Sequence, residues 1–243
     1  MPTHSLAPHP AQVTDHAARR GVGWAFLAAA GVWILYIVLA FTVSADYEEA
    51  LVDASHALDT PVNRLPAETL AEIGQDHPWS YVSAIVLLLA PAALILATRR
   101  AAAVTGDRWG PGLAWLGAIV WWGYLLLNLG LVTDPRDLPP LTRDLDVLTV
   151  PLVSVGSVLA LVSFVVSAWS LRRHGCRRVA SGVAALVAAA LLVLSVVASV
   201  SSGWDEPVPP VGLLPAELIV GVALLVGTRR NQAFVSPSGG RRR

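Results

Sequence analysis

Six long apolar runs constrain this 243-residue chain more than any other feature of its sequence. They cover residues 22–44, 79–98, 111–132, 148–171, 179–200 and 211–228. A helix needs about 17–25 such residues to cross the hydrocarbon core of a bilayer. Backbone polar groups inside a bilayer must bond within their own segment, and the runs are continuous rather than alternating, so we expect helices and not strands. The sequence therefore predicts an all-α polytopic membrane protein with six transmembrane helices.

Arginine is unevenly distributed between the two ends of these predicted helices. The chain has seventeen arginines and no lysine. If the runs cross the membrane in turn, only Arg64, Arg136 and Arg143 fall on one side, and the remaining fourteen fall on the other. Short loops rich in arginine stay in the cytoplasm. We therefore expect three helical hairpins of the same orientation, with the N and C termini both cytoplasmic.

The segments outside the runs suggest a simple domain organisation. We interpret residues 1–20 as a disordered cytoplasmic tail, residues 21–230 as the transmembrane domain and residues 231–243 as a disordered basic tail. The outer loop, 45–78, is the only sizeable extramembrane segment. Apolar residues recur there at helical spacing, and Pro66 is suited to begin a second helix that Gly74 ends. The loop thus predicts two short amphipathic helices lying at the outer membrane surface.

Composition also indicates a location. The lack of lysine and the excess of Ala, Val, Leu and Arg are typical of a GC-rich genome, and hence of a bacterial plasma (inner) membrane. The first apolar run exceeds the 7–15 residues, roughly, of a signal-peptide core, so we expect it to be retained. Cys176 is the only cysteine, which excludes a disulfide within the chain.

Several residues predict how the helices pack. Gly117, with Ala114 and Ala118, and the series Ser181, Ala185 and Ala189 are small enough to let helices approach closely. Pro91 should kink the second predicted helix, because it lacks an N–H group. The pattern V-W-x-x-Y occurs twice, with its tryptophans at positions 33 and 121. An internal repeat and a chance match both remain open, since topology alone explains the similar flanking charges.

Polar groups inside the predicted helices offer one candidate site. Glu217 is the acidic residue within the sixth run, and ionisable residues are costly there, so it is a functional hypothesis. Five further polar residues are expected in the outer half of the membrane: Asn128, Ser154, Ser157, Ser195 and Ser199. The inner half, by contrast, looks apolar. We interpret this set as an outward-facing polar pocket in which Glu217 binds a proton or cation. The alternative is that Glu217 lies at the interface or forms a helix–helix hydrogen bond with Asn128.

No motif for catalysis accompanies this site. The sequence contains no H-E-x-x-H, G-x-S-x-G or Walker motif, and no histidine falls inside an apolar run. We therefore expect no enzymatic activity, no cofactor and no metal. The favoured hypothesis is a membrane protein that binds or moves a small solute, ion or lipid. The alternative is an accessory or assembly subunit of a larger membrane complex.

The expected partners follow from the same observations. They are the lipid bilayer, anionic lipid head groups on the cytoplasmic side, and either another membrane protein or a second copy of the chain. Nothing in the sequence favours nucleic acid.

Overall fold

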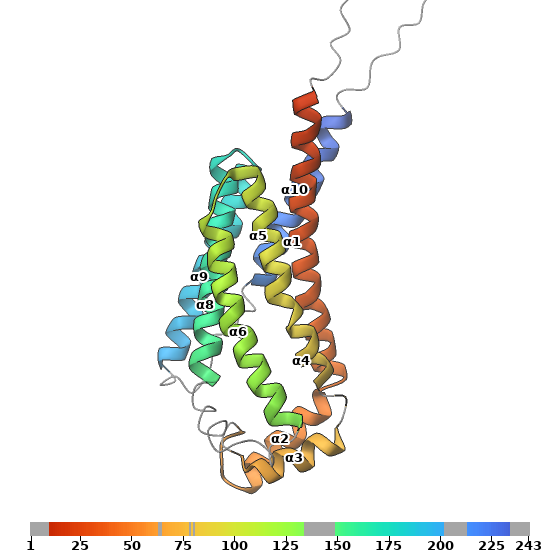
Figure 1. Ribbon diagram of the computed structural model, residues 1–243, viewed down its shortest axis with the longest axis vertical. Helices are drawn as coiled ribbons and strands as arrows, with labels where there is room; N and C mark the ends of the chain where they lie inside the picture. Colours follow the sequence, from red (N-terminus) through yellow and green to blue (C-terminus); the bar gives the residue numbers. More distant parts are fainter. Residues whose placement is uncertain are drawn as a thin grey trace, which may run out of the picture.

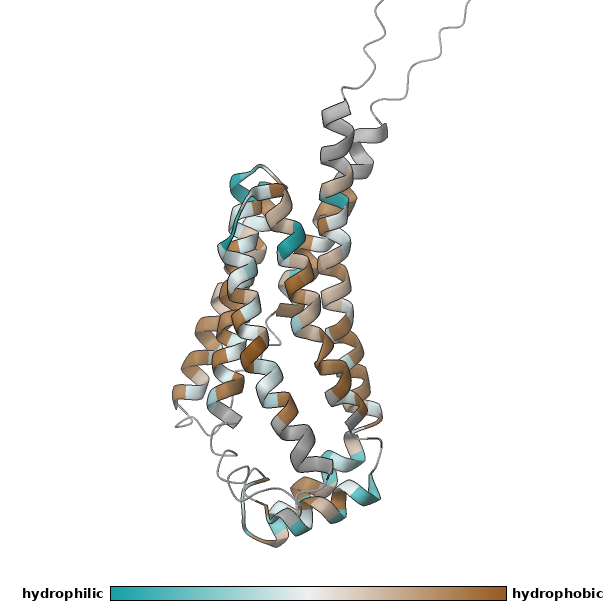
Figure 2. Cartoon of the chain, in the orientation of Figure 1, coloured by the Kyte–Doolittle hydropathy of each residue, from teal (hydrophilic) through white to brown (hydrophobic). Residues whose placement is uncertain are grey.

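The computed structural model describes residues 10–62, 65–77, 79, 81–133, 149–201 and 213–233, and all regular structure within them is helical (Figure 1). By length and composition, four segments are able to cross a membrane: Ala17–Thr42, Ile85–Thr105, Pro151–Arg173 and Arg178–Ser201. Figure 2 shows hydrophobic residues all along the long helices. The prediction of an all-α chain with membrane-spanning helices is confirmed at this level.

The described helices are α1 (Pro10–Thr42), α2 (Ala45–Ala57), α3 (Ala67–Asp76), α4 (Tyr81–Leu87), α5 (Leu89–Thr105), α6 (Trp109–Thr133), α8 (Thr149–Arg173), α9 (Arg178–Ser201) and α10 (Leu213–Ala233). Helix α1 begins within the stretch 1–20 that we interpreted as a tail, and α10 continues past residue 230. The rest of both predicted tails, residues 1–9 and 234–243, lies outside the described residues.

The long helices form a ring in chain order. Each of α1, α5, α6, α8 and α9 packs against the next long helix, and α10 closes the ring against α1. Figure 1 shows α1 and α10 side by side, with α2 and α3 crossing one end of the bundle. The most extensive contacts join α6 to α8 and α1 to α10. The last helix of the chain is thus held mainly by the first.

Glycines permit the close approach of both of these helix pairs. A Cβ atom added to Gly23 of α1 would lie 3.1 Å from the carbonyl oxygen of Gly221 in α10. A Cβ atom on Gly117 of α6 would lie 3.1 Å from the carbonyl oxygen of Gly156 in α8. The predicted packing role of Gly117 is confirmed, whereas the other three glycines carried no prediction.

A break separates α4 from α5, as Pro91 predicts. The missing N–H group and the ring of a proline disrupt the helical turn that precedes it. The helix is interrupted at Leu88, three residues earlier. The indole Nε1 of Trp122 in α6 donates a hydrogen bond of 2.9 Å to the Leu88 carbonyl. A side chain of another helix thus satisfies a backbone group at the break.

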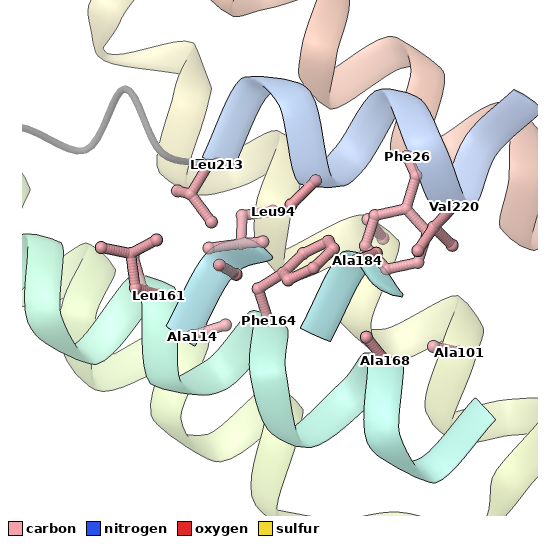
Figure 3. Packing of buried hydrophobic residues seen from close by; sticks show 14 of the residues in the cluster. Phe26, Leu94, Ala101, Ala114, Leu161, Phe164, Ala168, Ala184, Leu213 and Val220 are labelled. Atoms are coloured by element: carbon pink, nitrogen blue, oxygen red, sulfur yellow. The ribbon is translucent and has the colours of Figure 1, made fainter. Parts of the chain in front are cut away.

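Aromatic rings and small residues fill the centre of the ring of helices (Figure 3). The rings of Phe26 in α1 and Phe164 in α8 meet edge to face, with centroids 5.5 Å apart. Trp33 and Trp121, the tryptophans of the two V-W-x-x-Y patterns, are both buried, and their ring centroids are 5.6 Å apart. The repeated pattern therefore marks a contact between α1 and α6, although shared ancestry of the two segments stays a hypothesis.

The two helices predicted in the outer loop are present as α2 and α3. Helix α3 starts at Ala67, directly after Pro66, but it continues to Asp76. The prediction that Gly74 ends it is therefore wrong, because a glycine two residues before the last one does not by itself stop a helix that packs against α2 and α6.

Candidate functional site

Glu217 lies on the inner face of α10. Leu213, Ala216 and Val220 share this face, and all four side chains are buried. The Glu217 side chain is fully buried, and neither of its carboxylate oxygens has a hydrogen-bond partner among the described residues. An ionised carboxylate without a partner is very unfavourable in an apolar interior. This group must therefore carry a proton or meet a cation or donor that the described residues do not supply there.

The surroundings of Glu217 are apolar. In Figure 3 the side chains of Leu94 and Phe164 point toward the stretch of α10 between Leu213 and Val220. Both belong to the buried cluster that also contains Leu213 and Val220. Glu217 follows Leu213 and precedes Val220 by one helical turn each, so its side chain shares this apolar section of the bundle.

Glu217 lies close to the middle of the bundle. Gly221, one turn along α10, faces Gly23, which lies near the start of the 26-residue segment Ala17–Thr42 of α1. Because α1 and α10 run in opposite directions, Glu217 is level with a point about 15 Å into that segment at 1.5 Å per residue. Glu217 lies in the second turn of α10, which begins at Leu213, and its expected place in the outer half of the membrane stays a prediction.

The other five predicted residues take different positions. Ser154 and Ser157 are buried on α8, and the Ser157 hydroxyl has no partner among the described residues. Ser199 is buried and Ser195 is half-buried in the last two turns of α9. The side chain of Asn128 lies outside the described residues, so its contact with Glu217 stays a prediction.

One pocket is lined entirely by described residues. It adjoins Trp33, Pro91, Leu94, Trp121, Gly156 and Leu213, among others, and its cavity volume is about 10 Å³, roughly what a single water molecule needs. Its walls are apolar, and none of the six predicted residues lines it. The Nε1 of Trp121 has no hydrogen-bond partner among the described residues. Leu213 lines this pocket, and Glu217 follows Leu213 by one turn of α10.

Two buried serines of α8 were missed by the sequence reasoning. Ser163 and Ser167 lie four residues apart on one face of α8, toward its arginine-rich end. Ser163 donates a hydrogen bond of 2.8 Å to the Gly110 carbonyl, whereas the Ser167 hydroxyl has no described partner. A Cβ atom at position 110 would overlap that hydroxyl. The expectation of an apolar inner half is therefore wrong, and the four-residue serine spacing was the signal available in the sequence.

The end of the bundle that carries α2 and α3 holds a second polar group. The hydroxyls of Ser44 and Ser83 share a buried hydrogen bond of 2.9 Å. The rings of Tyr47 and His77 meet edge to face, with centroids 6.3 Å apart. Partial desolvation raises the pKa of the Glu48 carboxyl even though much of this side chain remains exposed. Burial, and then the charge of Glu48, raises the pKa of Tyr47. These contacts tie the short helices to the bundle.

No candidate metal centre emerges from the part of the chain that the structure describes, where no three His, Cys, Asp or Glu side chains converge. Comparisons with known proteins give no match to a family model, a curated protein or a solved structure. The chemistry of Glu217 and its surroundings is therefore the basis for a functional interpretation.

Proposed function

We propose that this chain is a plasma-membrane protein of six spans that binds or moves a proton or a small cation through Glu217 and catalyses no reaction. Helix α6, with 25 residues, and the apolar stretch Leu213–Val226 of α10 would complete the four segments already described. The arginine asymmetry supports three hairpins with both termini in the cytoplasm.

The observation that carries this proposal is the fully buried carboxyl of Glu217, which has no hydrogen-bond partner among the described residues. Acidic residues inside membrane bundles are rare and commonly belong to ion pathways or proton relays. Ser163 and Ser167 continue the polar groups of the interior toward the arginine-rich end of α8.

A second candidate function, an accessory subunit of a larger membrane complex, is supported by helix α9. Its span Arg178–Ser201 is the least buried of the four candidate spans, with 22% of its residues inside the bundle. Large side chains such as Leu186, Val193 and Leu194 are exposed along its outer face. Such a face suits either lipid or another apolar helix.

The test of the leading proposal uses the full chain in vesicles that contain a pH-sensitive dye, with proton and Na⁺ or K⁺ gradients imposed in turn. We expect flux or gradient-dependent binding in the unmodified protein and a loss of at least about tenfold in Glu217→Gln, because an amide of the same shape can neither ionise nor release a proton. Glu72→Gln, on the exposed surface of α3, is the matched control and should behave like the unmodified chain.

Two results would contradict this proposal. Full activity in Glu217→Gln would remove Glu217 from the pathway. The absence of any proton or cation response in the unmodified, folded protein would reject ion binding and favour the accessory subunit. Unchanged helical circular dichroism in Glu217→Gln would show that a loss of activity does not come from misfolding.

A further inference from the structure

The turn between α8 and α9 is strongly basic. Residues 172–178 read Arg-Arg-His-Gly-Cys-Arg-Arg and include no acidic residue. All four arginine side chains are exposed. Figure 2 shows the hydrophilic residues gathered at this end of the bundle, where the chain turns from α8 into α9 and from α5 into α6. The turn thus presents a concentrated positive charge at one rim of the molecule.

The backbone of this turn is fixed by its own hydrogen bonds. The N–H groups of Gly175 and Cys176 donate to the carbonyls of Arg172 and Leu171, at 3.1 and 2.9 Å. The Ser181 hydroxyl donates to the Cys176 carbonyl at 2.7 Å, and the Cys176 side chain is buried. Because both ends of the turn are anchored, its arginines project from a defined frame rather than from a loose loop.

Arg172 is the arginine whose side chain is held in place. Its guanidinium carbon lies 4.4 Å from the centre of the Trp169 ring. Its stem passes over α9, where a Cβ atom at Gly182 would lie 3.2 Å from the Arg172 Cδ. No carboxylate among the described residues forms an ion pair with this guanidinium. Stacking on an aromatic ring leaves the N–H edges of a guanidinium available to an anion.

The location of Arg172 identifies the anion. The candidate span Pro151–Arg173 ends at this residue pair, and the next candidate span begins at Arg178. The turn therefore coincides with the boundary of the hydrocarbon region, where tryptophans such as Trp169 are favoured. Phosphate groups of lipids are the anions concentrated at that depth, and an arginine fork bonds two phosphate oxygens at once.

We infer that the α8–α9 turn binds the phosphate of an anionic membrane lipid, with Arg172 as the direct ligand and Trp169 as the residue that orients it. Arg173, Arg177 and Arg178 add to the attractive field without an equivalent fixed geometry. The inference rests on the membrane placement in the proposed function, but it does not depend on Glu217. Arginines attract anionic head groups in general, and the inference places one such head group at a defined site.

The test titrates the purified full chain in neutral detergent with dihexanoyl phosphatidylglycerol or dihexanoyl phosphatidylcholine and follows the thermal unfolding midpoint. We expect the anionic lipid to raise the midpoint and the zwitterionic lipid to have little effect. Arg172→Gln should weaken the apparent affinity by about tenfold, because it removes a charge-assisted hydrogen bond. Arg173→Gln is the matched control, since it removes the same charge one residue away, and should weaken it by about threefold or less.

Trp169→Leu checks the orienting role without changing any charge. It should weaken phosphatidylglycerol binding by about threefold, because the guanidinium loses its aromatic support. Arg172→Lys should fold like the unmodified chain and still lose most of the selectivity, since an ammonium group cannot bond two phosphate oxygens as a fork.

Three outcomes would overturn the inference: equal losses in Arg172→Gln and Arg173→Gln, an equal response to both lipids, or a midpoint shift from inorganic phosphate at the same concentration as large as that from the lipid. The first would indicate a diffuse basic surface, and the last a site for free anions. The titration in detergent is independent of membrane orientation and of ion movement. A negative lipid titration would therefore not contradict the proposal for Glu217. A negative result in the ion-flux experiment would likewise not contradict the lipid site.

Discussion

At the scale of single residues, the lack of side-chain atoms at two further glycines tightly constrains the bundle. A Cβ atom on Gly221 would lie 2.7 Å from the Leu27 Cγ of α1. A Cβ atom on Gly156 would lie 2.9 Å from the Trp121 Cδ1 of α6. Distances this short require a shift of the neighbouring helix or side chain. These two helix contacts therefore depend on the smallest residues in them.

Gly221→Ala should lower the free energy of unfolding by about 1–3 kcal/mol, because the added methyl group overpacks the contact between α1 and α10. Gly31→Ala on α1 is the control, since nothing lies within 4 Å of the position of its Cβ atom. That substitution should be neutral or stabilise the protein by up to about 1 kcal/mol, through the higher helix propensity of alanine. Denaturant unfolding of both variants in the same detergent provides the measurement, and equal stabilities would contradict the close contact.

At the scale of elements, the interruption between α4 and α5 depends both on a residue of the same helix and on a side chain from another helix. Pro91 explains why the helix breaks where it does. It does not explain how the exposed backbone is satisfied, which requires the Trp122 side chain from α6. One hydrogen bond, from the Trp122 side chain to the Leu88 carbonyl, thus links the interrupted helix to α6.

Trp122→Phe should cost about 1–3 kcal/mol of stability, because the Leu88 carbonyl loses its donor while most of the aromatic contact is kept. Trp24→Phe, at a side chain that is 60% exposed, is the control and should change stability by less than about 0.5 kcal/mol. In a Pro91→Ala background the helix can close its own hydrogen bonds, so Trp122→Phe should cost less there. Thermal unfolding of the four proteins of this cycle measures the coupling, and strict additivity would argue against the link.

At the scale of the whole molecule, the closed ring places the first and last helices side by side, with the start of α1 and the end of α10 at one end of the bundle. An even number of spans is the arrangement that brings both ends to one side of a membrane. The turns at residues 106–108 and 174–177, each of which carries an arginine, lie at that same end. The proposed cytoplasmic location of the termini thus agrees with the arginine distribution.

Reporter fusions measure this topology directly. A reporter at residue 60, between α2 and α3, should indicate the outside, whereas reporters at the exposed Gly106 and after residue 243 should indicate the cytoplasm. Equal signals from residue 60 and the C terminus would refute six spans. A Gly106 signal unlike that of the C terminus would place an odd number of crossings after α5.

Much of this molecule was determined by the sequence alone, because its causes are local. Continuous apolar runs specify helices in a membrane, Pro91 specifies the break before α5, and Pro66 specifies the start of α3. The single acidic residue within the last apolar run identified Glu217 as the leading candidate. Each of these conclusions depends on residues within a few turns of one another, which is the range that periodicity and proline chemistry describe.

Only the tertiary structure decided which faces meet and at what depth. The contact of Gly23 with Gly221, the support of Leu88 by Trp122 and the packing of Ser163 against Gly110 join residues far apart in the chain. Glu217 is level with a point about 15 Å along the α1 segment because α10 packs in register with α1, its partner at the opposite end of the sequence. Register between helices follows from the fit of their surfaces, and apolar residues all around a helix leave that fit unspecified until the neighbours are in place.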